Sequence, residues 1–176
     1  MTDRTMLRLA KAFWDIALWR RTPAHLPASL FLLALVATAA ALLEGLSAFL
    51  PPVSSDRIVA RIVMSVVSPL AFAWAVLVLT RHRQRFLQTG SALLGVGVLA
   101  QIGLYPIGSL IHVIGSDRLA SVPFGVLMLA GLIWYVLACA NIWRAALDSG
   151  VALGVAVSVG YLVLSIVLEQ QLLPAS

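Results

Sequence analysis

The sequence predicts an all-α membrane protein, a bundle of five transmembrane helices preceded by an amphipathic helix at the membrane surface. Of its 176 residues, 61% are hydrophobic and only 11% are charged. A soluble domain carries about 25% charged residues, because its surface must be solvated. The mean hydropathy is +1.01, and the apolar residues form five long runs separated by short polar segments. Lipid is therefore the expected solvent for most of the chain.

The first 27 residues are expected to form a cytoplasmic helix and linker at the membrane surface. Arg4, Arg8, Lys11 and Asp15 recur at helical spacing and make one polar face, while aromatic and aliphatic residues such as Trp14 cover the rest. Such a helix is typical of the membrane interface. A cleaved signal peptide is the rival interpretation, which the long charged start and the further apolar runs disfavour.

Each apolar run is long enough to cross the hydrocarbon core, which takes about 20 residues of helix. Pro51-Pro52 ends the first run, basic residues at 81–85 end the second, and Pro174 closes the last. The connections are short, so neighbouring helices are expected to be antiparallel. Within the domain 28–176, the spans are expected at residues 28–50, 58–80, 89–113, 122–143 and 151–173.

Basic residues give the expected orientation, because cytoplasmic loops carry an excess of Lys and Arg. With the N-terminus inside, nine Lys and Arg residues lie on the inner side and three on the outer side. The abundance of Arg, Ala, Leu and Val hints at a GC-rich bacterial genome. We therefore expect a bacterial inner-membrane protein with a cytoplasmic N-terminus and a periplasmic C-terminus. Nucleic acid is not an expected partner despite the net charge of +5, since the arginines lie between apolar runs.

Polar residues within the apolar runs are candidate site residues, because charge in lipid is costly and often functional. Glu44 and Arg61 lie near the outer ends of neighbouring spans, at matching depth. Their structural interpretation is an ion pair, and their functional one is a proton or cation site. The remaining residues can hydrogen-bond between helices or at the interface. The candidate intramembrane cluster is Glu44, Arg61, Gln101, His112, Asn141 and Glu169.

Small residues at four-residue spacing form two stripes, which let helix backbones approach closely in lipid. These stripes are consistent with helix packing within the bundle and also with self-association of the chain. The residues are Gly150, Gly154 and Ser158 on the last run, and Ala37, Ala41 and Gly45 on the first.

Motifs for catalysis and for cofactors are missing from the sequence. It has no Walker loop, no HExxH and no GxSxG, which are the patterns of common nucleotide, zinc and hydrolase sites. Cys139 is the only cysteine, so an internal disulfide and the zinc-type cysteine spacings are excluded. We expect no enzyme, no cofactor and no bound metal.

Two segments resemble the small bacterial Yip1-like membrane proteins. They are Phe13-Trp14-Asp15-Ile16-Ala17-Leu18-Trp19-Arg20-Arg21-Thr22-Pro23-Ala24-His25-Leu26-Pro27-Ala28-Ser29 and Arg85-Phe86-Leu87-Gln88-Thr89-Gly90-Ser91-Ala92-Leu93-Leu94-Gly95. The resemblance implies an N-terminal cytoplasmic helix followed by five spans. Eukaryotic members of that family act in vesicle trafficking through small GTPases, but this chain lacks a long acidic or tyrosine-rich cytoplasmic region.

Three functions are consistent with these patterns. The leading hypothesis is a non-enzymatic Yip1-like protein that organises the bilayer or scaffolds other membrane proteins. The second is a small transporter or channel subunit with a polar cavity near Glu44, Arg61 and Gln101. The third is an accessory subunit of a larger membrane complex. The expected partners are the lipid bilayer and either other membrane proteins or further copies of the chain.

Overall fold

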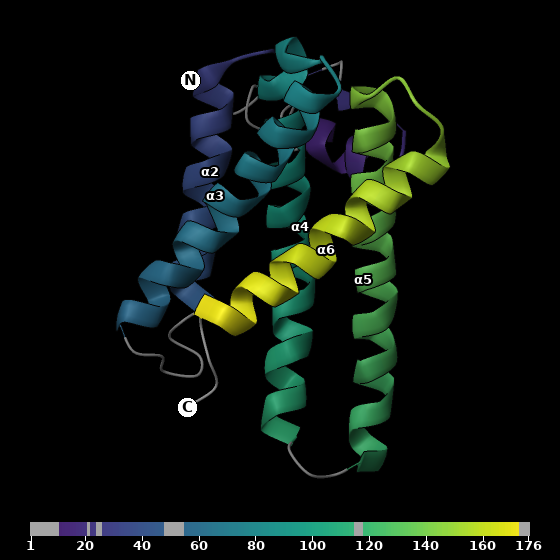
Figure 1. Ribbon diagram of the computed structural model, residues 1–176. Coiled ribbons are helices and arrows are strands. Elements are labelled where there is room, and N and C mark those ends of the chain that lie inside the picture. Colours follow the sequence, from purple (N-terminus) through teal and green to yellow (C-terminus); the bar gives the residue numbers. More distant parts are fainter. Residues whose placement is uncertain (1–10, 21, 24–25, 48–54, 115–117, 173–176) are drawn as a thin grey trace.

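In the computed structural model, all regular secondary structure of the described residues is helical (Figure 1). The described residues are 11–20, 22–23, 26–47, 55–114 and 118–172. Residues 11–17 form a short N-terminal helix. The other elements are α2 (Leu30–Ser47), α3 (Ser55–Leu79), the 3-10 turn η2 (Arg83–Arg85), α4 (Phe86–Ile114), α5 (Arg118–Ala146) and α6 (Val151–Leu172). The predicted all-helical fold class is confirmed.

Four stretches of helix are long and apolar enough to cross a membrane, namely Ile58–Leu79, Arg83–Leu110, Val122–Ala146 and Val151–Gln171. The apolar stretch Leu30–Leu46 of α2 is shorter. Four of the five expected spans therefore meet the length and composition of a span within the described residues. Large apolar side chains cover the helix surfaces. Leu42 is 69% and Leu79 is 82% exposed, which suits contact with lipid better than contact with water.

The helix bounds differ from the expected ones by a few residues, and three prolines lie inside helices. The fourth expected span, 122–143, already included Pro123, but α5 begins four residues earlier, at Arg118. Pro69 and Pro106 also lie inside helices that continue past them. A proline removes one backbone hydrogen bond, and neighbouring helices and Ser or Thr side chains compensate for it in membrane bundles. These three prolines therefore do not end their helices.

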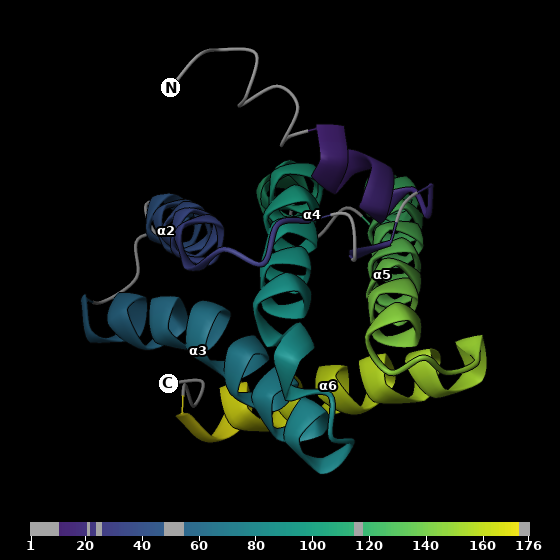
Figure 2. The ribbon, with the colours of Figure 1, turned by 90° about the horizontal axis from the view of Figure 1, so that it is seen from above.

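Three helices run upright and two slant across them (Figures 1 and 2). α2, α4 and α5 share one approximate direction, with α4 next to α5. α3 and α6 are strongly tilted against that direction and lie on one side of the upright helices. The N-terminal helix lies on the opposite side of α4 and α5 (Figure 2).

The hydrophobic core lies at one end of the bundle, where the N-terminal parts of α2 and α4 meet the C-terminal parts of α3 and α5. Ala73, Ala92 and Ala138 are 0% exposed, and Trp143 is 1% exposed. Small side chains let helices approach closely in lipid, and the indole of Trp143 fills the remaining space. This end of the bundle is therefore tightly packed.

The N-terminal helix is docked on the bundle by its apolar face. Ile16 and Ala17 are buried, and Phe13 lies directly against Gly95 of α4, where any larger side chain would collide with its ring. Trp14 is exposed, as an interfacial helix requires. Asp15 is buried, whereas Lys11, one turn earlier on the expected polar face, is exposed. Residues 1–10, including Arg4 and Arg8, lie outside the described residues.

The stripe on α6 provides close helix packing at one position. A side chain at Gly154 would collide with the carbonyl oxygen of Ala140, so α5 and α6 touch there through their backbones. Ser158 is buried beside it and donates to the carbonyl oxygen of Gly154 at 2.9 Å. Gly150 faces open space.

The stripe on α2 makes ordinary contacts instead of a close approach. Ala37 packs against the core, and Ala41 is half-buried. A side chain at Gly45 would stand at a normal 3.7 Å from Ile62 of α3. The sequence pattern therefore predicts the close approach on α6 but overstates it on α2.

Candidate binding cavity

A polar network joins α2, α3 and α4 inside the bundle. Arg61 Nε lies 2.8 Å from Glu44 Oε1, so the ion pair expected from matching depth is present. Gln101 donates from Nε2 to Glu44 Oε2 at 3.0 Å. Arg61 also donates from Nη2 to the hydroxyl of Tyr105 at 2.8 Å. The network thus spans four side chains from three helices.

The carboxylate of Glu44 needs these donors, because a charge removed from water is costly unless it is paired and hydrogen-bonded. The Glu44 side chain is 9% exposed, whereas that of Arg61 is 32% exposed. The buried member of the pair therefore receives a charge partner and an amide donor. The more open member keeps access to a hollow beside it.

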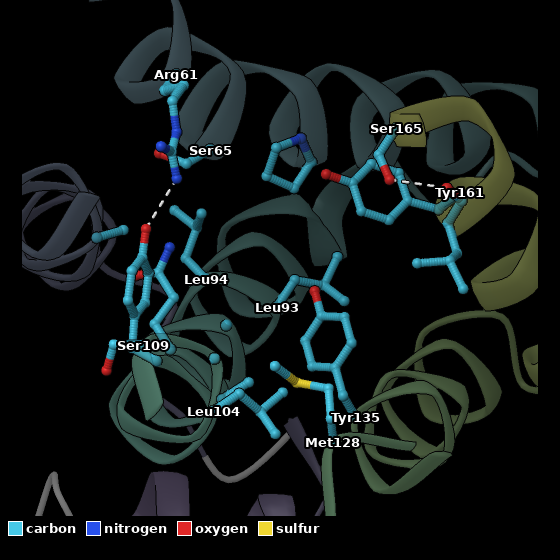
Figure 3. A pocket seen from close by; sticks show the side chains of 18 residues that line it. Arg61, Ser65, Leu93, Leu94, Leu104, Ser109, Met128, Tyr135, Tyr161 and Ser165 are labelled. Carbon is cyan, nitrogen blue, oxygen red and sulfur yellow. Dashed lines mark hydrogen bonds between the residues drawn. The ribbon is translucent and has the colours of Figure 1, made fainter. Parts of the chain in front are cut away.

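That hollow is a cavity of about 600 Å³ to which all five long helices contribute (Figure 3). Pockets for small molecules usually enclose about 300–1,000 Å³, with mostly apolar walls and a few polar groups. Here Leu93, Leu94 and Leu104 form the apolar wall, and Arg61 reaches in from α3 (Figure 3). The lining residues are Ala40, Arg61, Ser65, Pro69, Leu93, Leu94, Gly97, Ala100, Gln101, Leu104, Tyr105, Gly108, Ser109, Met128, Tyr135, Tyr161, Leu162 and Ser165.

A second hollow of about 280 Å³ adjoins the polar end of the first. Arg61, Ser65, Tyr105, Tyr161 and Ser165 line both hollows. The second is also bordered by both acidic side chains of the predicted cluster, Glu44 and Glu169. We call the two hollows together the bundle cavity, with an apolar part and an acidic end.

Four of the six predicted cluster residues therefore gather around the bundle cavity, namely Glu44, Arg61, Gln101 and Glu169. Asn141 does not join them. It lies toward the tightly packed end and accepts a hydrogen bond from Arg144 at 3.1 Å. The side chain of His112 lies outside the described part of the chain.

Three tyrosines of the cavity were not predicted as site residues. Tyr105 belongs to the polar network, while Tyr135 and Tyr161 bring their rings to the cavity from α5 and α6 (Figure 3). Spacing would have found two of them, since residues four apart share a helix face. Tyr105 follows Gln101 by four, and Tyr161 precedes Ser165 by four.

A separate charged cluster lies at the tightly packed end, around a hollow of about 510 Å³. Arg85 donates to the carbonyl oxygens of Ala145 and Ala146 at 2.9 and 3.1 Å, and pairs with Asp148 at 2.7 Å. These carbonyls end α5 and have no helical donor. The hydrogen bond from Arg85 holds the pKa of the Asp148 carboxyl below its ordinary value of 3.8. This cluster serves to cap a helix.

Neither the possible metal ligands nor the comparisons with known proteins assign a function to the cavity. Within the described residues, no group of three or more His, Cys, Asp or Glu side chains could hold a metal ion. No protein-family model matches the chain, and no similar curated protein or solved structure was found.

Proposed function

We propose that the chain is a five-span protein of a bacterial inner membrane, with its N-terminus in the cytoplasm and its C-terminus in the periplasm. The four long apolar helices support this, together with the 18 residues of α2. At 1.5 Å per residue, α2 is about 27 Å long, close to the thickness of the hydrocarbon core. In this orientation the tightly packed end faces the cytoplasm, and the acidic end of the cavity faces the periplasm.

We further propose that this protein is non-enzymatic and binds a small amphipathic molecule in the bundle cavity, as a transporter subunit or as a binding protein. One observation carries the proposal. The polar network of Glu44, Arg61 and Gln101 borders a cavity whose other walls are apolar. A polar end beside apolar walls matches a molecule with a polar head and an apolar body.

A scaffolding role of the Yip1-like type is the second proposal, and a specific contact favours it. The two segments that carry the resemblance pack against each other. Phe13 rests on Gly95, and Gln88 donates to the carbonyl oxygen of Leu26 at 2.9 Å. The residues that carry the resemblance thus also dock the N-terminal helix on α4. This supports a similarity of architecture to the Yip1-like proteins. An accessory subunit would present the same exposed helix faces.

Cysteine labelling in membranes tests the ligand-binding proposal, because a thiol reacts with a water-soluble reagent only where water reaches it. In a Cys139→Ala background, Ser65→Cys and Ser165→Cys place thiols in the bundle cavity. Val63→Cys and Val163→Cys are matched controls on the same helices, where the native side chains are 49% and 55% exposed on the outer surface.

We expect the two cavity positions to react with a membrane-impermeant thiol reagent and the two outer positions to be protected by lipid. Equal protection of all four positions would mean a dry bundle and would favour the scaffolding proposal. The same approach tests orientation. Gly150→Cys, at an exposed position next to the same loop, should react only after the membrane is opened, whereas Ser176→Cys should react in intact spheroplasts.

A further inference from the structure

We propose that the molecule bound in the bundle cavity is an organic cation with an apolar body. This inference rests on the proposed binding function and adds the charge class of the ligand. It follows from the charges, the unused acceptor and the aromatic rings that border the cavity.

The positive charge that borders the cavity is already used within the protein. Arg61 pairs with Glu44 at 2.8 Å and donates to the hydroxyl of Tyr105 at 2.8 Å. An anionic ligand would have to displace a buried carboxylate from this arginine. Removing one partner of a buried pair is strongly unfavourable, because the other charge stays behind. Arg61 is therefore a poor anchor for an anion.

The negative charge exceeds the positive charge among the described residues that line the cavity. The charged side chains there are Glu44, Arg61 and Glu169, which sum to −1. Glu44 and Arg61 offset each other, so Glu169 supplies the excess. No ion pair of Glu169 is found within the described residues. A monovalent cation at the acidic end would restore neutrality.

An unused hydrogen-bond acceptor belongs to Gln101, which lines the apolar part of the bundle cavity. Gln101 donates its amide nitrogen to Glu44, while its Oε1 atom is buried and has no partner among the described residues. A buried acceptor without a donor is costly. An ammonium or another N–H group of a ligand would supply the donor.

Aromatic rings complete the match. Tyr135 and Tyr161 border the cavity from α5 and α6 (Figure 3), and Tyr105 lies beside the polar network. The faces of such rings attract organic cations, and the attraction grows where water is excluded. The leucine wall provides contact for the apolar body of the ligand. A lipophilic cation satisfies all of these features together.

The test compares two probe ions of nearly equal size and shape and of opposite charge, tetraphenylphosphonium and tetraphenylborate. Binding to the purified full-length protein in detergent is measured by equilibrium dialysis against protein-free micelles. We expect saturable binding of the cation and no competition by the anion. Gly97→Phe should abolish binding, because Gly97 lines the cavity and faces open space. Gly103→Phe, at an open and exposed position of the same helix, should leave binding unchanged.

Variants of Glu169 isolate the role of charge. Glu169→Gln should weaken cation binding by about tenfold, the order expected for losing one ion–ion contact at a partly hydrated site. Glu169→Asp should retain binding. The swap Glu169→Gln with Gln170→Glu keeps the total charge and moves it to an exposed neighbour outside the cavity. The swap should therefore bind as weakly as the single variant.

The outcomes separate this inference from the proposed function. Equal binding of both ions, blocked by Gly97→Phe, would overturn the preference for cations and leave the ligand-binding proposal standing. Wild-type affinity in the charge swap would overturn the role of Glu169. Absence of binding by either ion would overturn the inference. In that case, reactive thiols at Ser65→Cys and Ser165→Cys would still support a water-accessible cavity. Unreactive thiols would contradict the proposed binding function as well.

Discussion

Replacing Arg61 with glutamine should destabilise the protein more than replacing Glu44 with glutamine, although both changes break the same ion pair. Arg61→Gln leaves a carboxylate whose side chain is 9% exposed, held by the amide of Gln101. Glu44→Gln leaves a guanidinium whose side chain is 32% exposed and still bonded to Tyr105. A long arginine can also turn toward water, whereas the buried carboxylate cannot.

The magnitudes follow from this difference in burial. Breaking a fully buried pair by removing one partner costs about 3–5 kcal/mol. Because Arg61 is about one third exposed, part of the interaction is screened, and we expect about 2–3 kcal/mol for Arg61→Gln and about 1 kcal/mol for Glu44→Gln. For a chain of this length, 1 kcal/mol shifts Tm by about 2–4 °C. The double variant should lose less than the sum, by about 1–2 kcal/mol, since neither charge remains.

The assay is the thermal midpoint of the purified protein in one detergent, followed by the loss of the monodisperse peak in size-exclusion chromatography. Arg144→Gln is the matched control, because Arg144 is exposed and donates a hydrogen bond to Asn141, three residues earlier on the same helix. It should lower Tm by about 2 °C or less. Equal losses in the two single variants, with an additive double variant, would refute the idea that burial of Glu44 decides the energetics.

Two further predictions concern helix packing and helix capping. Gly154→Ala should destabilise the protein by about 1–3 kcal/mol, because its new methyl group meets the carbonyl oxygen of Ala140. Gly160→Ala on the same helix meets open space, so its Tm should stay level or rise, and a loss as large as that of Gly154→Ala would contradict the packing argument. Arg85 lowers the pKa of Asp148 in the folded state below its ordinary value of 3.8. The stability from this pair is therefore fully present above pH 3.8 and is lost as the pH falls through the lower pKa of the folded state. Asp148→Asn should therefore lower Tm slightly at neutral pH and reduce its fall in acid, and an unchanged acid profile would argue against the pair.

The helices could be predicted from the sequence because lipid imposes a simple requirement on length and polarity. The last span was expected at 151–173, and α6 runs from Val151 to Leu172. The fourth span was expected at 122–143, whereas α5 runs from Arg118 to Ala146, because the helix extends beyond the apolar run that marks the span. The Ser149 hydroxyl, just before α6, is buried without a hydrogen-bond partner among the described residues. Asp148, the preceding residue, pairs with Arg85. Arg85 is distant in sequence, so local patterns could not reveal this contact.

The pairing of Glu44 with Arg61 could be predicted because depth in a membrane is a one-dimensional quantity that the sequence encodes through helical rise. The cavity could not be predicted in this way, because its presence depends on the angles between the helices. Asn141 was grouped with the cluster only because it is polar and lies in an apolar run, although it hydrogen-bonds at a different part of the bundle. A stricter test was available in the sequence. Polar residues at four-residue spacing mark the cavity face of α4 as Gln101, Tyr105 and Ser109, and that of α6 as Tyr161, Ser165 and Glu169.

The two ends of the bundle differ because their interfaces hold side chains of different size and polarity. At the packed end, alanines at 0% exposure bring the helices together around Trp143. Toward the other end, Pro69 and three tyrosines replace them, and Gly97 leaves open space beside them. A rigid, dry end can hold the geometry of a hollow one, since close packing resists deformation. A change at the packed end, such as Gly154→Ala, should therefore lower stability first. A change at the hollow end, such as Gly97→Phe, should remove ligand binding while the fold persists.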